Sequence, residues 1–204
     1  MKGRRLAALF FLAVILAVPL ALGGSQTIVA AFTKGDGHNN LDLSLLQVGD
    51  IILTRGSIFD YIVPGYWTHT MIYIGNGWTV EATWPTVKYT PAEEIHNNDE
   101  ACIIRVATPT SVKYAAVAFA CAQVGKPYDL VWVTKQVYGP SYYCSELAWA
   151  AYLAAGGPDI DANPGWSWTY AYGVAPTELF EDGNTYLVAW ANYCLLYTSP
   201  SPRD

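Results

Sequence analysis

The fold is decided by THTMIYIGNGWTVEA, residues 68–82. Two largely apolar runs flank Asn76-Gly77, and both of these residue types tolerate the positive φ angles that a tight hairpin turn requires. The segment therefore predicts a β-hairpin with strands near residues 70–74 and 78–82. Its even-numbered positions are mostly apolar, so one face of this hairpin should pack on a core.

The odd-numbered positions of the hairpin carry His69 and Glu81, and their relative placement depends on the turn. An odd-length loop over residues 75–77 would pair Ile74 with Trp78. It would make Glu81 the diagonal neighbour of His69, with the backbones about 7–8 Å apart. A two-residue Asn-Gly loop would put the two side chains on opposite faces, because a one-residue slip reverses every side chain.

The remaining periodicity predicts an α+β domain. Short apolar or alternating segments at 51–54, 101–106 and 185–190 are typical of strands. Helices are expected over 111–124 and from about 141 to 155, and both are apolar enough to be buried. Strands at both ends with helices between them indicate an antiparallel sheet packed against helices.

A candidate nucleophile lies at the start of the second predicted helix, in YYCSEL, residues 142–147. Unpaired amide groups and the positive end of the helix dipole favour a thiolate at Cys144. His69 is suited to accept the thiol proton, and Glu81 to fix the orientation of the imidazole. A cysteine among Tyr and Leu residues is also typical of a small buried apolar side chain, so a structural role remains the alternative.

Five motifs, in this order, resemble the YiiX/YebB-like cysteine hydrolases, in the circularly permuted branch of the NlpC-type, papain-like superfamily. They are VGDII (48–52), WTHTMIYIG (67–75), VEA (80–82), GKPYD (125–129) and YCSEL (143–147). PTEL (176–179) is also similar to the family. In that branch the histidine precedes the cysteine, as it does here.

The resemblance implies a permuted papain-like fold with Cys144 as nucleophile, His69 as general base and Glu81 as the orienting residue. The spacing of His69 and Glu81 also resembles the paired histidines of lecithin:retinol acyltransferase relatives, although the second residue is Glu here. The backbone N–H of Cys144 is one expected oxyanion donor. Tyr142, Tyr143 and Tyr128 are expected to border the substrate cleft.

The two ends of the chain are expected to lie outside the fold. Basic residues followed by an apolar run over 6–22 predict a signal peptide or membrane anchor at 1–23, and hence an exported protein, extracellular, periplasmic or on the outer membrane face. A linker is expected at 24–44 and one hydrolase domain at 45–193. Residues 194–204 resemble a translated sequencing adapter and are expected to be a non-native tail.

Charge and residue spacing exclude several function classes. The chain has a net charge of −6, and beyond residue 23 it carries eight basic against 17 acidic side chains. A surface this acidic disfavours nucleic-acid binding. His and Cys residues lack the paired spacing of a zinc site, so neither a metal nor another cofactor is expected.

Two further features have alternative interpretations. Cys102 and Cys121 fall in a predicted strand and helix, where lone buried thiols are expected, although export would permit a disulfide between them. The aromatic residues of segment 166–172 alternate along the chain and are expected to be buried on one flank. If exposed, they could stack on sugar rings or acyl chains beside the cleft.

The sequence thus predicts an exported cysteine hydrolase that cleaves an amide bond through a thioester, with a cell-envelope peptide or a small acylated compound as substrate. An acyl-ester or lipid hydrolase, or an acyltransferase, of the same superfamily is the alternative within the enzyme class. A catalytically inactive module that binds envelope components is the alternative outside it.

Overall fold

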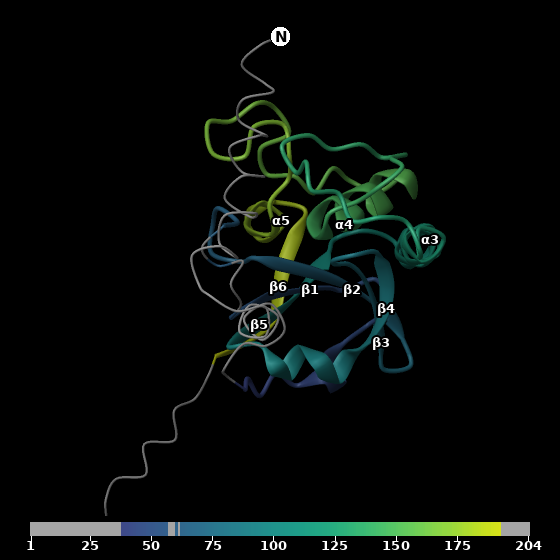
Figure 1. Cartoon of the computed structure of the whole chain (residues 1–204). Helices are drawn as coiled ribbons and strands as arrows, with labels where there is room; N and C mark the ends of the chain where they lie inside the picture. Colours follow the sequence, from purple (N-terminus) through teal and green to yellow (C-terminus); the bar gives the residue numbers. More distant parts are fainter. Residues whose placement is uncertain (1–37, 57–59, 61, 193–204) are drawn as a thin grey trace, which may run out of the picture.

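A computed structural model describes residues 38–56, 60 and 62–192. Six strands form one antiparallel sheet in the order β4-β3-β2-β1-β5-β6. The strands are β1 (Ile51–Arg55), β2 (His69–Gly75), β3 (Trp78–Ala82), β4 (Val87–Pro91), β5 (Glu100–Val106) and β6 (Thr185–Asn192). The helices α3 (Thr110–Cys121), α4 (Cys144–Ala154) and α5 (Pro176–Glu181) lie together on one side of it (Figure 1). The α+β prediction is confirmed.

The hairpin of β2 and β3 combines features of both turns that the sequence left open, the two-residue loop and the odd-length loop. Gly75 pairs with Trp78, so the turn is the two-residue Asn76-Gly77 loop. Between Tyr73 and Gly75 the register shifts by one residue at a β-bulge, and Gly75 has φ +100° there. Beyond the bulge Ile72 pairs with Val80, which is the register expected for an odd-length loop.

Both faces of the sheet are covered. On one face Ile51, Leu53, Ile72 and Val80 share a buried cluster with α4. On the other face a second apolar cluster includes Ile52, Met71, Leu41 and Ile95. Leu41 precedes the short 3-10 helix η1 (Leu43–Leu45), and Ile95 belongs to η3 (Ala92–Asn97). The hairpin face predicted to be polar therefore carries an apolar patch as well.

The two long helices differ in burial. Residues Cys144 to Tyr152 of α4 are all buried, which agrees with the prediction for this segment. In α3 only Ala116 and Ala120 are buried, and Tyr114 is 58% exposed. The prediction that this segment is buried all round is wrong, because α3 contacts the rest of the domain along only one narrow stripe.

The amino-terminal boundary of the domain differs from the expected one. Asn39 is buried and donates to the carbonyl oxygens of Ile95 and Asn98, both at 2.8 Å. Leu41 is also buried. Residues from Asn39 onward therefore belong to the packed domain, which corrects the expected linker at 24–44 over its last six residues.

Several predictions concern residues outside the described part of the chain. These are the signal peptide or anchor at 1–23, the linker up to residue 37 and the tail at 194–204. Among the residues that the structure does describe, none forms a helix with the length and apolar character needed to cross a membrane.

Cys102, on β5, and Cys121, at the end of α3, are free thiols in the structure. Cys102 is buried as predicted, whereas Cys121 is only half-buried. The burial expected for segment 166–172, hereafter the aromatic loop, is wrong. Trp166 is 48% exposed and Trp168 91%. Ser167 and Ala171 pair with each other, so the segment turns back on itself instead of extending as a strand with one buried flank.

Candidate active site

The sheet and α4 bring together the three residues with predicted catalytic roles. His69 begins β2, Glu81 lies in β3, and Cys144 is the first residue of α4. His69 Nε2 lies 2.5 Å from Glu81 Oε2. His69 also interacts with the Cys144 side chain, through a hydrogen bond and through charge. The side chains thus form a chain from thiol to imidazole to carboxylate.

Burial and charge control the protonation of His69. Burial alone would lower its pKa because it disfavours the charged imidazolium. The hydrogen bonds to Cys144 and Glu81, together with the charges of both partners, outweigh burial and raise the pKa to about 10. The imidazole is therefore protonated at neutral pH, which suits a thiolate and imidazolium pair.

Glu81 is buried, with only 4% of its surface exposed. Burial favours its neutral form, but hydrogen bonds from His69 and Thr90 and the positive charges of His69 and Lys88 lower its pKa overall. A buried carboxylate needs such partners, since an unpaired buried charge is strongly destabilising. Glu81 is thus held as an anion that can pair with the imidazolium.

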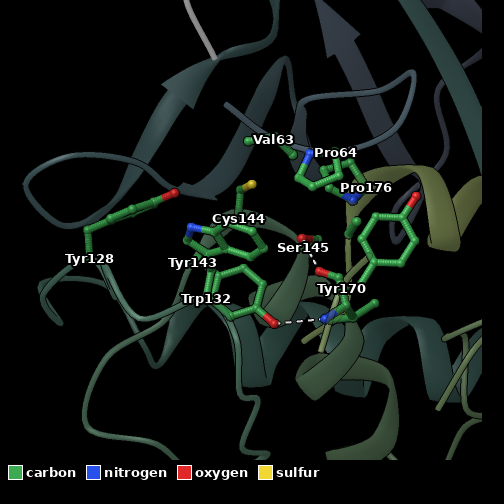
Figure 2. A pocket seen from close by; sticks show the side chains of 11 residues that line it. Val63, Pro64, Tyr128, Trp132, Tyr143, Cys144, Ser145, Tyr170 and Pro176 are labelled. Carbon is green, nitrogen blue, oxygen red and sulfur yellow. Dashed lines mark hydrogen bonds between the residues drawn. The ribbon is translucent and has the colours of Figure 1, made fainter. Parts of the chain in front are cut away.

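The Cys144 side chain lines a small pocket of about 30 Å³ (Figure 2). Apart from Cys144, no lining residue has an acidic or basic side chain that is charged at neutral pH. The lining residues are Val63, Pro64, Tyr128, Trp132, Tyr143, Cys144, Ser145, Tyr170, Val174, Ala175 and Pro176. Of these, Val63, Pro64, Trp132, Val174 and Ala175 had not been singled out from the sequence, because they come from segments that only the fold brings together.

The three tyrosines predicted to border the cleft have different positions. Tyr128 lines the pocket, and its side chain extends toward the side where the sulfur lies (Figure 2). Tyr143 also lines it, but its hydroxyl accepts a 2.9 Å hydrogen bond from the Val174 amide and so holds the pocket wall. Tyr142 is wholly buried and does not line the pocket, which corrects the prediction for this residue.

The orientation of Tyr142 follows from the chain just before α4. Its hydroxyl donates to the carbonyl oxygen of Val137 at 2.8 Å and accepts from the Gly139 amide at 3.1 Å. Its backbone forms a bridge with Tyr128. Because these contacts keep residue 142 extended, α4 begins at Cys144 and not near residue 141 as expected.

Glu146 fastens the segment after Trp132 to the first turn of α4. Its carboxylate accepts hydrogen bonds from the backbone amides of Gln136, at 2.7 Å, and Tyr143, at 3.2 Å. Burial is the main reason why its pKa is raised to about 8, although these hydrogen bonds oppose the shift. One buried side chain thus ties a pocket-lining segment to the helix that carries Cys144.

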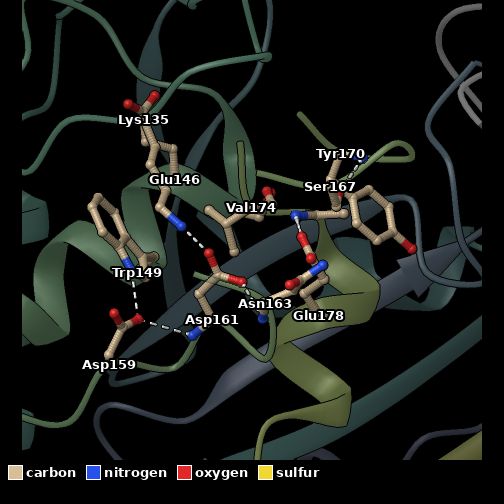
Figure 3. A network of polar contacts seen from close by, with 12 residues as sticks. Lys135, Glu146, Trp149, Asp159, Asp161, Asn163, Ser167, Tyr170, Val174 and Glu178 are labelled. Atoms are coloured by element: carbon tan, nitrogen blue, oxygen red, sulfur yellow. Dashed lines mark hydrogen bonds and ion pairs between the residues drawn. The ribbon is translucent and has the colours of Figure 1, made fainter. Parts of the chain in front are cut away.

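A polar network surrounds Lys135 and Asp161 (Figure 3). Lys135 pairs with the buried carboxylate of Asp161, and its Nζ lies 4.9 Å from the centre of the Trp149 ring. Trp149 Nε1 donates to Asp159 at 2.9 Å. These contacts connect the segment that bears Trp132 to the middle of α4 and to the segment following it.

The sequence pattern did not indicate Thr90 and Lys88. Both contact Glu81 Oε1, the outer oxygen, which faces away from His69. Both lie in β4, a strand that had not been predicted. The alternation of apolar Val87 and Tyr89 with polar Lys88 and Thr90 was a signal for it, since this period is typical of a strand. In the structure Val87 and Thr90 are buried, whereas Lys88 and Tyr89 are exposed.

Comparisons with known proteins give a consistent result. Residues 45–189 match the model of a family described as permuted papain-like amidase enzyme, YaeF/YiiX, C92 family. The uncharacterized protein YycO of Bacillus subtilis (strain 168) is 33% identical over 89 residues, which are 43% of this chain and 34% of YycO. The chain thus matches about a third of the length of that relative.

The crystal structure of YiiX from Escherichia coli O157:H7, described as a metalloprotein, has a similar fold. The TM-score is 0.56 at 22% identity, over 70% of this chain and 96% of YiiX. The described residues of the present chain contain no group of three or more His, Cys, Asp or Glu side chains that could hold a metal ion. At 22% identity the likeness to YiiX concerns the fold alone, which is the permuted papain-like fold that the motifs implied.

The family model covers most of the chain and spans His69, Glu81 and Cys144, in the order expected for a permuted papain-like protein. The chain therefore belongs to the permuted papain-like amidase family of YaeF and YiiX, C92.

Proposed function

We propose that this protein is a cysteine hydrolase that cleaves an amide bond through a thioester intermediate. The observation that carries this proposal is the connected series of Cys144, His69 and Glu81, in which Cys144 lines a pocket whose other side chains are uncharged. The series combines a nucleophile, a proton carrier and an orienting group, which together suit covalent catalysis.

In the proposed reaction the Cys144 thiolate attacks the carbonyl carbon, and the carbonyl oxygen takes the negative charge. His69 then donates its proton to the leaving nitrogen, so the carbon–nitrogen bond breaks and a thioester remains. Water gives a proton to His69 as its oxygen attacks the thioester carbon. Release of the acid regenerates the thiolate and the imidazolium.

Two donors are available for the oxyanion. The Cys144 amide lies in the first turn of α4, where amide groups have no partner within the helix. The Tyr128 hydroxyl borders the same pocket. Burial and the nearby charge of Cys144 raise the pKa of Tyr128 well above its ordinary value, which keeps the phenol protonated as a donor.

The pocket lining supports a substrate with an uncharged, apolar group next to the reacting carbonyl. A charged group would lose its hydration there without gaining an ionic partner. The same observation favours a second candidate, the hydrolysis or transfer of an acyl ester or lipid acyl group. We further propose that the protein is exported and acts on a cell-envelope peptide or acylated compound, on the basis of the basic and apolar leader at 1–23.

Intact-mass spectrometry on the whole chain tests the reaction class. The wild-type protein, incubated with acyl anilides and acyl esters that differ only in an apolar or acidic acyl group, should gain the mass of the apolar acyl group. Cys144→Ala should gain none, and Cys121→Ala provides a matched control at a free thiol outside the site. A wild-type protein that forms no adduct and alkylates as slowly as Cys144→Ala would instead support an inactive binding module.

A further inference from the structure

The buried carboxylate of Glu81 divides its contacts between two strands. Oε2 meets His69 on β2, whereas Oε1 accepts a 2.5 Å hydrogen bond from the Thr90 hydroxyl on β4. Glu81 lies directly opposite Lys88 in the sheet, and Thr79 lies directly opposite Thr90. Thr90 is therefore the diagonal neighbour of Glu81 on the same face of the sheet.

The Thr90 hydroxyl has a restricted environment. Thr90 is 7% exposed, and its carbonyl oxygen accepts a 3.0 Å hydrogen bond from the buried hydroxyl of Thr79. The carbonyl contact fixes the backbone at residue 90, so the Thr90 hydroxyl is presented to Glu81 from a constrained position. A hydrogen bond between a hydroxyl and a buried carboxylate is stronger than one between neutral groups.

Lys88 contributes differently. Its Nζ lies 3.8 Å from Glu81 Oε1, but its side chain is 52% exposed. An exposed ammonium is screened by water and has many rotamers, so it adds charge without fixing a direction. The directional contact on the outer oxygen of Glu81 is therefore the Thr90 hydroxyl.

We propose that Thr90 is a positioning residue for the reaction of Cys144, acting through Glu81 and His69. The Thr90 hydroxyl fixes the rotation of the Glu81 carboxylate so that Oε2 points at His69 Nε2. This places the opposite nitrogen of the imidazole toward the thiol. The inference rests on the proposed function, which assigns Cys144, His69 and Glu81 to catalysis.

The charged groups around Glu81 determine the expected effect of pH. They are His69 on β2, Lys88 on β4 and Glu94 on η3. Glu94 lines the same surface hollow as Glu81, and Cys144 interacts with the other side of His69. The Thr90 hydrogen bond lowers the pKa of Glu81. Without it, Glu81 should take up a proton at higher pH, so the acidic limb of the activity profile should move to higher pH.

The test compares three variants of the full chain. Thr90→Val removes the hydroxyl at nearly constant volume, and Thr90→Ser keeps it. Thr185→Val is the control, because the Thr185 hydroxyl on β6 bonds the carbonyl oxygens of Leu179 and Asp182 and does not contact Glu81. Thr90→Val should lower kcat about tenfold with KM unchanged and shift the acidic limb upward. Thr90→Ser should restore most of the wild-type kcat and acidic limb, and Thr185→Val should keep the wild-type pH profile. A Thr90→Val protein with wild-type kcat and acidic limb would overturn the proposal.

A double-mutant cycle with Glu81→Gln separates positioning from a general loss of stability. If Thr90 acts through Glu81, Thr90→Val should add little to the effect of Glu81→Gln. Fully multiplicative effects on kcat would contradict the proposal. The rate at which iodoacetamide alkylates Cys144 provides a second measurement that needs no substrate. If the wild-type thiol alkylates no faster than an ordinary cysteine, the proposed function itself fails, whereas a fast wild-type rate that Thr90→Val leaves unchanged rejects only the role of Thr90.

Discussion

His69 and Glu81 meet because the strand between His69 and the turn contains one extra residue. The turn at Asn76-Gly77 alone would place the two side chains on opposite faces of the hairpin. The bulge between Tyr73 and Gly75 reverses this, and the imidazole and carboxylate come within 2.5 Å of each other. A single backbone irregularity therefore decides whether His69 has a carboxylate partner.

Gly75→Ala should disturb this register. Gly75 has φ +100°, and an added Cβ would lie 3.2 Å from Val48 Cγ2. We expect a loss of about 1–3 kcal/mol in the free energy of unfolding, together with lower activity, because the strained bulge would shift. Urea denaturation and the Cys144 alkylation rate measure the two effects. Gly183→Ala is the control, since a Cβ there meets nothing within 4 Å. Wild-type alkylation by Gly75→Ala would show that the site tolerates the altered bulge.

The activity of the wild-type protein should persist to alkaline pH and decline as His69 loses its proton. Its pKa is raised from 6.5 to about 10. Stability contributed by the protonated imidazole is therefore fully present below pH 6.5 and is lost as the pH rises through about 10. NMR titration of the ring should show this high value, and Cys144→Ala should lower it by removing the thiol contact. Titration of wild-type His69 near 6.5 would be incompatible with the ion pair.

Glu146 should make the protein less stable as the pH rises from 5 to 8. Its pKa is raised from 4.5 to about 8, so the folded state retains a proton that the unfolded state has lost in this range. Stability then falls with pH, by an amount on the order of a few kcal/mol. Thermal unfolding at several pH values measures the slope, and Glu146→Gln should flatten it. An unchanged slope in this variant would assign the pH dependence to other groups.

Replacement by alanine should lower the free energy of unfolding strongly at one tryptophan and hardly at all at another. Trp67 is 1% exposed and packs against Phe180 and Trp190, so Trp67→Ala should cost about 3–5 kcal/mol of unfolding free energy. Trp168 is 91% exposed, and Trp168→Ala should change stability by less than about 0.5 kcal/mol. Equilibrium urea unfolding distinguishes these outcomes. A large loss in Trp168→Ala would mean that the aromatic loop packs more tightly than its exposure implies.

The Lys135 and Asp161 pair should be sensitive to removal of one partner. Lys135→Met leaves a buried carboxylate without its cation, which typically costs about 3–5 kcal/mol. The double variant Lys135→Met, Asp161→Leu removes both charges and should recover much of this stability. Chemical denaturation of both proteins provides the comparison. Equal losses in the single and double variants would show that packing around Trp149, and not charge, dominates.

The local features of the site could be predicted from the sequence. Asn76-Gly77 between apolar runs indicated the hairpin, and the apolar segment after Cys144 indicated a helix beginning near the thiol. The motifs around His69, Glu81 and Cys144 implied the permuted papain-like fold. Local patterns succeed here because turn geometry and helix starts depend on the residues that form them.

The tertiary structure decided the features that depend on distant partners. The bulge at Gly75 fixed the face of Glu81, β4 brought Thr90 to its outer oxygen, and packing left Trp168 in solvent and Tyr142 in the core. The alternation of apolar and polar residues along a strand indicates only that its two faces differ in polarity. Which face is buried, and which side chains meet across it, is set by free energies of packing and hydrogen bonding between segments far apart in the sequence.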